Sequence, residues 1–140
     1  MKLQTILYVR DQGASTRFYG HVLAREPTLE VPGMTELEVG DSVLGLMPES
    51  SIERLLGEAL PSPAAGAGIP RAELYFLVDE PAAYHARALV AGARELSPLS
   101  LRDWGHEAAY SLDLDGHVLA FARPASSSSR APDSGAFERS

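Results

Sequence analysis

The chain has 140 residues, which suits one domain or two small modules that share a core. Its formal net charge of −7 argues against a nucleic-acid partner, because proteins that bind the phosphate backbone usually carry a basic patch. Cysteine is absent, which excludes disulfides, thiolate zinc sites and cysteine nucleophiles. No apolar run approaches the roughly 18 residues of a membrane span, and we see no secretory signal, so we expect a cytoplasmic protein with no membrane partner.

Residues 1–60 predict the order strand, helix, strand, strand, strand, followed in the chain by a short helix. The segment 3–11 is short and rich in β-branched and aromatic residues, as is typical of a strand. In segment 13–24, apolar residues four apart form one helical face: Ala14, Phe18 and Val22. Turn signals at Pro32-Gly33 and Gly40-Asp41 then separate three extended runs: 28–31, 34–39 and 42–48.

The short helix is expected at residues 50–60, with Ser51 as its N-cap. Its predicted inner face consists of Ile52, Leu55, Leu56 and Ala59. The next ten residues, 61–70, contain three prolines and two glycines and predict a linker.

The pattern then restarts, and residues 71–124 predict a second module with the same element order. A strand at 72–79 precedes a helix at 81–93, which has Pro81 in its first turn. Three further strands are expected at 94–102, 106–114 and 116–123, with a type I′ turn at Asp115-Gly116. The serine-rich tail, 125–140, is expected to be disordered.

This repeat predicts an α+β fold of two tandem βαβββ modules. In each module, the helix covers only one face of a four-stranded sheet, so the other face must be buried or line a cavity. Two such modules side by side would form a curved trough.

The repeat resembles the vicinal oxygen chelate superfamily, in the segments "YVRD…ASTRFYGHVLA" and "RDWGHEAAYSLDLDGHVLAFARP". This superfamily includes glyoxalase I, ring-cleaving dioxygenases, fosfomycin-resistance enzymes and bleomycin-resistance binding proteins. The resemblance covers about residues 1–124 and implies the glyoxalase-like fold. It implies little about function, because the fold hosts both enzymes and binding proteins. It also implies a homodimer, in which modules from two chains are able to complete a site.

In metal-dependent members, four sheet positions can hold an ion, and these fall here on Gln4, Gly45, Glu73 and Ala120. Gln4 is compatible with coordination, and Glu73 stands where histidine is usual. Gly45 and Ala120 have no side-chain donor, whereas a catalytic zinc needs about three protein ligands. We therefore expect no metal cofactor; if a divalent ion binds, its ligands would be Gln4 and Glu73 with water.

The four histidines form no chelating pair in the sequence. His21 is expected late in the first helix, His85 on the second helix in a solvent-facing or partly packed position, and His117 beside the last turn. His117 should face away from the trough if Ala120 faces it, since neighbouring residues of a strand alternate. His106 follows Trp104-Gly105 in a loop that could overhang the trough, and it is the histidine we keep as a candidate.

Strand alternation predicts a largely apolar pocket with a few polar groups, as is typical of ligand sites. Trp104 could stack on a planar ligand or serve as a hydrophobic anchor that closes one end of the sheet. Glu73, if buried, would favour a cation or act as a base; the alternative is a solvent-reached carboxylate at the strand start, paired with Arg71 or with nothing. The missing side chains at Gly45 and Ala120 should widen the pocket. Glu36 and Glu38, which share a strand face, are assigned to the solvated side. The predicted ligand-binding residues are Gln4, Ile6, Tyr8, Met47, Glu73, Tyr75, Trp104 and His106.

Three hypotheses follow from this pocket. The first, which we favour, is a small-molecule-binding protein that sequesters a partly aromatic or cationic ligand without metal and without catalysis. The second is a glyoxalase- or dioxygenase-type enzyme with an atypical divalent-metal site that uses Gln4, Glu73 and water or His106. The third is a scaffold without ligand, which the apolar trough disfavours, because exposed apolar patches usually serve binding.

Overall fold

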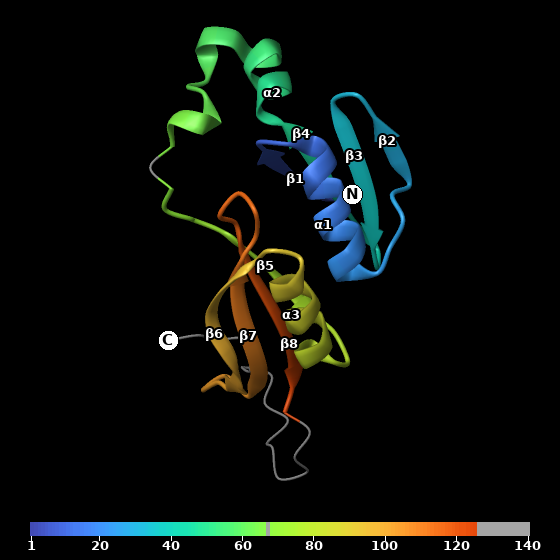
Figure 1. The fold of residues 1–140 in the computed structure, drawn as a ribbon, viewed down its shortest axis with the longest axis vertical. Helices are drawn as coiled ribbons and strands as arrows, with labels where there is room; N and C mark the ends of the chain where they lie inside the picture. The colour runs from blue at the N-terminus through green and yellow to red at the C-terminus, as the bar shows by residue number, and fades with distance from the viewer. Residues whose placement is uncertain (67, 126–140) are drawn as a thin grey trace. The chain divides into compact units, whose positions relative to one another are not determined.

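The computed structural model describes residues 1–66 and 68–125. The chain divides into two compact units, Met1–Ile69 and Pro70–Ser140, which are coloured blue to green and green to red in Figure 1. The tail predicted to be disordered lies outside the described residues beyond Ala125. None of the helices in the described chain, of which the longest has 12 residues, is long and apolar enough to cross a bilayer.

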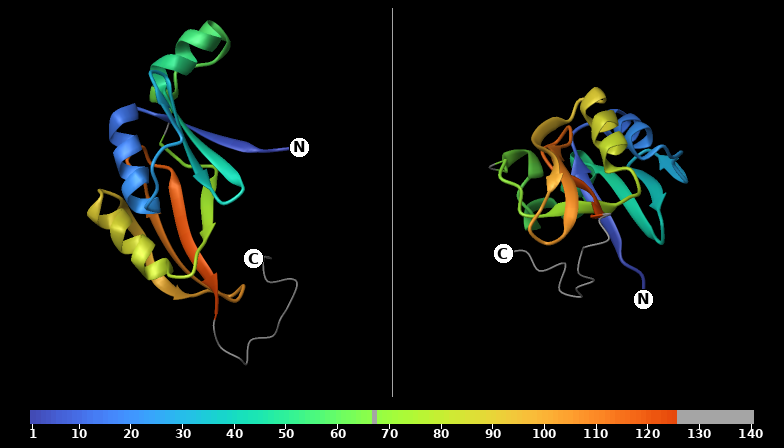
Figure 2. Two further views of the ribbon diagram at one scale, coloured as in Figure 1. Left: turned by 90° about the vertical axis from the view of Figure 1, so that its right-hand side faces the viewer. Right: turned by 90° about the horizontal axis from the view of Figure 1, so that it is seen from below.

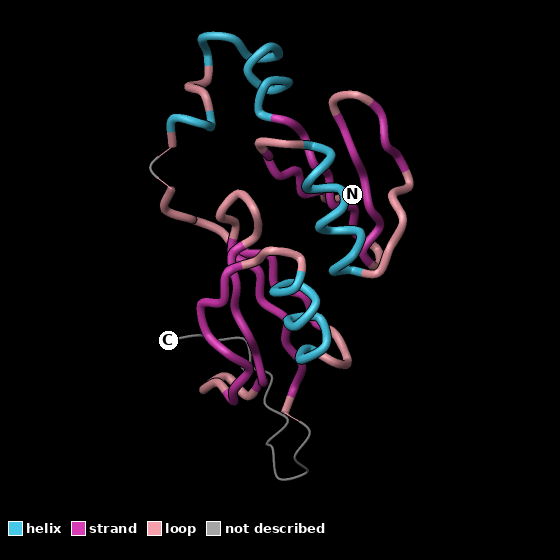
Figure 3. The backbone as a smooth tube through the Cα atoms, viewed as in Figure 1, coloured by secondary structure: helices cyan, strands magenta, loops and turns pink. Residues whose placement is uncertain are grey.

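The first unit is a βαβββ module. Its strand order is β1-β4-β3-β2, with β1 parallel to β4 and the other neighbours antiparallel. The connection that follows β4 carries helix α2 (Glu49–Leu56) and two single 3-10 turns (Figure 3). The elements of the module are β1 (Gln4–Val9), α1 (Gln12–Leu23), β2 (Leu29–Val31), β3 (Met34–Val39) and β4 (Ser42–Pro48).

The second unit repeats this topology. Its strand order is β5-β8-β7-β6, again with the first strand parallel to the last. Its elements are β5 (Glu73–Leu77), α3 (Pro81–Val90), β6 (Arg94–Leu101), β7 (His106–Leu112) and β8 (Val118–Pro124). The predicted α+β fold of two βαβββ modules is confirmed.

Each module packs its helix against one face of its own sheet (Figure 2). In the first, the Thr16 hydroxyl of α1 lies 2.9 Å from that of Thr35 in β3, and Asp11 caps α1 by accepting from the Ala14 N–H. In the second, Tyr84 of α3 stacks on Phe121 of β8, which is fully buried. Because strand residues alternate, the neighbours of Thr35 and Phe121 lie on the opposite face of each sheet. We call this helix-free side the open face.

Two local predictions about α2 are wrong. The helix begins at Glu49 directly after β4, so Pro48 is its N-cap and Ser51 lies inside the first turn. Pro48 keeps the extended backbone of β4 (ψ 144°) and makes no side-chain cap hydrogen bond, so the chain passes directly from strand into helix. Of the predicted inner face, only Ile52 is buried, while Leu55 is 69% exposed and Leu56 is 42% exposed. Within its own unit, the helix contacts β4, β1 and the 3-10 turn that follows it, and only its Ile52 side is buried.

The predicted type I′ turn is also wrong. Asp115 does not have a positive φ, and only Gly116 does, at 92°. The Asp113 N–H donates to the His117 carbonyl, which leaves a three-residue loop with glycine at the left-handed position. The Asp113 carboxylate fixes this loop by accepting from the Asp115 and His117 N–H groups and by contacting His117 Nδ1 at 2.8 Å.

Candidate functional site

The open face of the second sheet carries a row of residues set by strand register. Tyr75 of β5 lies opposite Ala120 of β8, and Ala120 lies opposite Tyr110 of β7. Both tyrosines are half-buried, whereas Ala120 is fully buried. The row therefore presents a small residue with one phenol ring on each side of it.

Tyr75, Trp104 and His106 form a hydrogen-bonded group, here called the aromatic cluster. Trp104 Nε1 donates to Tyr75 Oη over 2.9 Å, and the same oxygen lies 2.8 Å from His106 Nδ1. The Tyr75 and His106 rings stack with centroids 5.9 Å apart. Hydrogen bonds at the tips of these side chains restrict their rotamers, so the cluster is pre-organised.

The cluster depends on small side chains beneath it. Strand β8 lies between β5 and β7, so Tyr75 must cross β8 to reach His106. Where Tyr75 crosses the open face of β8, that strand presents Ala120 and Ala122, which are both fully buried. A larger side chain at either position would compete with the Tyr75 ring for the same space.

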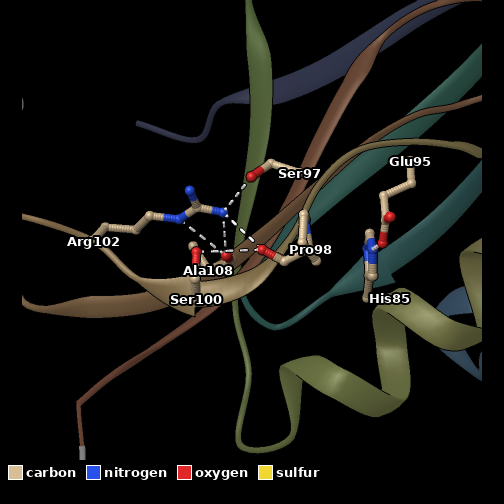
Figure 4. A network of polar contacts seen from close by, with 7 residues as sticks. All are labelled: His85, Glu95, Ser97, Pro98, Ser100, Arg102 and Ala108. Atoms are coloured by element: carbon tan, nitrogen blue, oxygen red, sulfur yellow. Dashed lines mark hydrogen bonds and ion pairs between the residues drawn. The ribbon is translucent and has the colours of Figure 1, made fainter.

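Arg102 lies beside this row and fills an irregularity of β6. The register of β6 against β7 shifts twice, between Glu95 and Ser97 and between Ser97 and Ser100. Such bulges leave backbone groups unpaired, and the Arg102 guanidinium satisfies two of them, the carbonyls of Ala108 and Pro98 (Figure 4). The Arg102 guanidinium carbon also lies 5.2 Å from the centre of the Tyr110 ring.

The predicted binding residues of the first unit lie on the open face of its own sheet. Gln4, Ile6 and Tyr8 alternate along β1, and Met47 lies opposite Tyr8. Gln4 Nε2 donates to Glu36 Oε2 over 3.0 Å, so Glu36 also belongs to this face.

The expectation that Gly45 and Ala120 widen a pocket is wrong. Gly45 is buried, and a Cβ there would lie 3.1 Å from Ile6 Cγ1 and 3.3 Å from both Gln4 Nε2 and Met34 Sδ. Neighbouring side chains have therefore closed over the glycine. Ala120 is likewise covered, with an exposed fraction of 0%.

The four family metal positions do not fit a chelated metal ion. Gly45 and Ala120 supply no side-chain donor, and the space beside Gly45 is occupied by Ile6, Gln4 and Met34. Of the other two positions, Gln4 donates from Nε2 to Glu36 and Glu73 is exposed at the start of β5, so only two side chains with oxygen donors remain for an ion. Within residues 1–66 and 68–125, no group of three or more histidine, aspartate or glutamate side chains is arranged to hold a metal ion.

The remaining histidines have structural partners or lie on the surface. His85 is buried against the sheet, on the face opposite the aromatic cluster, with Nε2 2.9 Å from Glu95 Oε2 (Figure 4). His117 belongs to the Asp113 turn, and His21 is exposed in the last turn of α1. His106 is not in an overhanging loop: it is the first residue of β7 and is only 3% exposed.

Sequence reasoning missed Tyr110, Arg102 and Glu36 as neighbours of the predicted residues. Tyr110 had a usable signal, because it shares the alternation of β7 with His106. Arg102 had no signal of its own, because its position depends on the bulges of β6. Pro98 is the one residue whose type indicates such a bulge in the sequence. Glu36 was assigned to the solvated side, and its contact with Gln4 follows from the pairing of both β1 and β3 with β4.

The chain belongs to the glyoxalase/bleomycin resistance protein/dioxygenase superfamily, whose model matches residues 3–121. It is similar to a glyoxalase-related enzyme from Fulvimarina pelagi, with 24% identity, a TM-score of 0.74 and coverage of 88% of this chain and 87% of that one. A family enzyme from Burkholderia phytofirmans has 21% identity and a TM-score of 0.74, over 86% of this chain and 96% of the other.

A protein from Agrobacterium tumefaciens, solved by NMR, has 25% identity and a TM-score of 0.70, over 89% of this chain and 98% of the other. No curated protein matches the chain. Likeness at this level of identity supports the fold, and the function must be argued from the site.

Proposed function

We propose that this protein binds a small, planar, partly aromatic molecule on the open face of the second sheet, without a metal ion and without turning it over. The observation that carries the proposal is the aromatic cluster. Three ring side chains meet there through hydrogen bonds, on the side of the sheet that no helix of the unit covers. Rigid rings with few polar groups are the usual lining of a small-molecule site.

Two features favour binding over metal-assisted catalysis. Two of the four family metal positions, Gly45 and Ala120, lack a side-chain donor, so the three protein ligands of a catalytic metal are not present at these positions. The hydrogen bonds among Tyr75, Trp104 and His106 hold the three rings of the cluster in place, which favours a role in binding. The cationic ligand that a buried Glu73 would attract is not favoured, because Glu73 is exposed.

Fluorescence provides the test, since Trp104 is the only tryptophan in the chain. A panel of planar aromatic compounds would be titrated into the protein, and binding at the cluster should quench or shift the emission of Trp104. Tyr75→Phe should weaken that binding roughly tenfold by releasing Trp104 and His106, which corresponds to about 1.4 kcal/mol.

The matched control is Tyr84→Phe, which changes the same atom on the opposite face of the same sheet, where Tyr84 stacks on Phe121. This variant should bind like the wild type. Equal loss in both variants, or no quenching by any planar compound, would contradict the proposed site.

A further inference from the structure

Arg102 carries a positive charge that no acidic side chain of the described residues balances. Its guanidinium donates to Ala108 O from Nε (3.1 Å) and Nη2 (2.7 Å), to Ser97 Oγ (3.0 Å) and to Pro98 O (3.0 Å). All of these acceptors are neutral. We propose that Arg102 binds a carboxylate group of the ligand, an inference that rests on the proposed function and specifies the ligand class as planar aromatic acids.

The environment of Arg102 makes an unbalanced charge costly. The side chain is half-buried, and a charge removed from water is stabilised best by an opposite charge. Acidic residues outnumber basic ones in this chain, 19 to 12, so the lack of a carboxylate beside Arg102 is a local feature. On the same sheet, Arg123 has one, with Nε 2.9 Å from Glu107 Oε1.

The guanidinium retains an unused donor. Nε and Nη2 make all of its hydrogen bonds to described residues, and Nη1 makes none; Figure 4 shows this nitrogen directed away from the four contacts. The other donors fix its position, so binding an anion there orders little further. Nη1 carries two N–H groups, which can serve one carboxylate, whereas a phosphate dianion calls for more donors.

The position of Arg102 matches an aromatic acid. The guanidinium lies over the Tyr110 ring, and Tyr110 lies in the same row as Tyr75, two strands away. Two strand spacings are about 10 Å, close to the length of a bicyclic aromatic acid. A ring against the aromatic cluster would thus place its carboxylate near Nη1.

The experiment compares 2-naphthoate with its neutral counterpart 2-naphthamide, by Trp104 fluorescence at low salt. The wild type should bind the acid roughly tenfold more tightly than the amide. In Arg102→Gln, the two affinities should agree within about twofold, with little change for the amide. Arg94→Gln makes the same charge change at an exposed position of β6 and should keep the preference. Thermal melting checks that each variant is folded, and the wild-type comparison stands even if Arg102→Gln is not.

Three results would overturn the inference while leaving the proposed function intact. They are equal binding of acid and amide by the wild type, an unchanged preference in Arg102→Gln, and tighter binding of the cationic 2-naphthylmethylamine. Absence of binding by all three naphthalenes and by every other planar compound would overturn the proposed function, and this inference with it.

Discussion

Replacing Tyr75 by phenylalanine removes one oxygen atom that two other side chains contact. Trp104 Nε1 lies 2.9 Å from that oxygen and His106 Nδ1 lies 2.8 Å from it. The Trp104 contact is half-exposed, so its loss should cost about 0.5–1 kcal/mol, whereas His106 is only 3% exposed and should lose about 1–2 kcal/mol. The free energy of unfolding should therefore fall by about 2 kcal/mol, which lowers Tm by roughly 6–10 °C for a chain of this size.

Urea unfolding followed by circular dichroism measures this loss, and the emission maximum of Trp104 reports the changed indole environment in the folded state. Tyr84→Phe is the control: its ring stacks on Phe121, and its hydroxyl has no hydrogen bond to a described residue, so the cost should stay below about 0.5 kcal/mol. If both variants lose the same stability and Trp104 emission is unchanged in Tyr75→Phe, the cluster is not the rigid unit described here.

Three further substitutions test the packing, and each cost below is the loss in the free energy of unfolding, measured with urea. Phe121→Ala should cost about 3–5 kcal/mol, because the ring is fully buried and stacks on Tyr84; a loss below 1 kcal/mol would contradict this core. Asp113→Ala should cost about 2–3 kcal/mol by releasing the turn N–H groups and His117, with Asp113→Asn intermediate, and equal stability of all three proteins would refute the role of the carboxylate. Gly45→Ala should cost about 1 kcal/mol because its neighbours must move, whereas a stabilised variant would indicate an open space there.

The fold could be predicted because its signals are local. Alternation in the strands, a four-residue spacing in the first helix and turn residues between runs were enough to order both modules. Alternation also predicted that Tyr75 and Ala120 share a face, which the register confirms. Local signals were misleading at Ser51 and at the Asp115-Gly116 turn. In the first case, the helix began earlier, directly after β4, without a side-chain cap; in the second, the Asp113 carboxylate selected a longer loop.

The site could be predicted only residue by residue. Tyr75, Trp104 and His106 were named separately, but their hydrogen bonds depend on the strand order that sets β8 between β5 and β7. Alanines on β8 permit the crossing, whereas in the sequence Ala120 indicated only a missing metal ligand and a wider pocket. Arg102 depends on two register shifts in β6, which arise from the pairing of whole strands.

Metal dependence of binding tests the central claim most directly. Metal content would be measured in the protein as purified. The protein would then be treated with a chelator, and 2-naphthoate titrated against Trp104 fluorescence before and after adding magnesium, manganese, nickel, zinc and iron(II) in turn. We expect less than about 0.1 metal ion per chain and one affinity throughout, because the family positions at Gly45 and Ala120 offer no donor. One tightly held ion per chain, or binding that appears only when a metal is restored, would contradict the account and favour a metal-dependent enzyme.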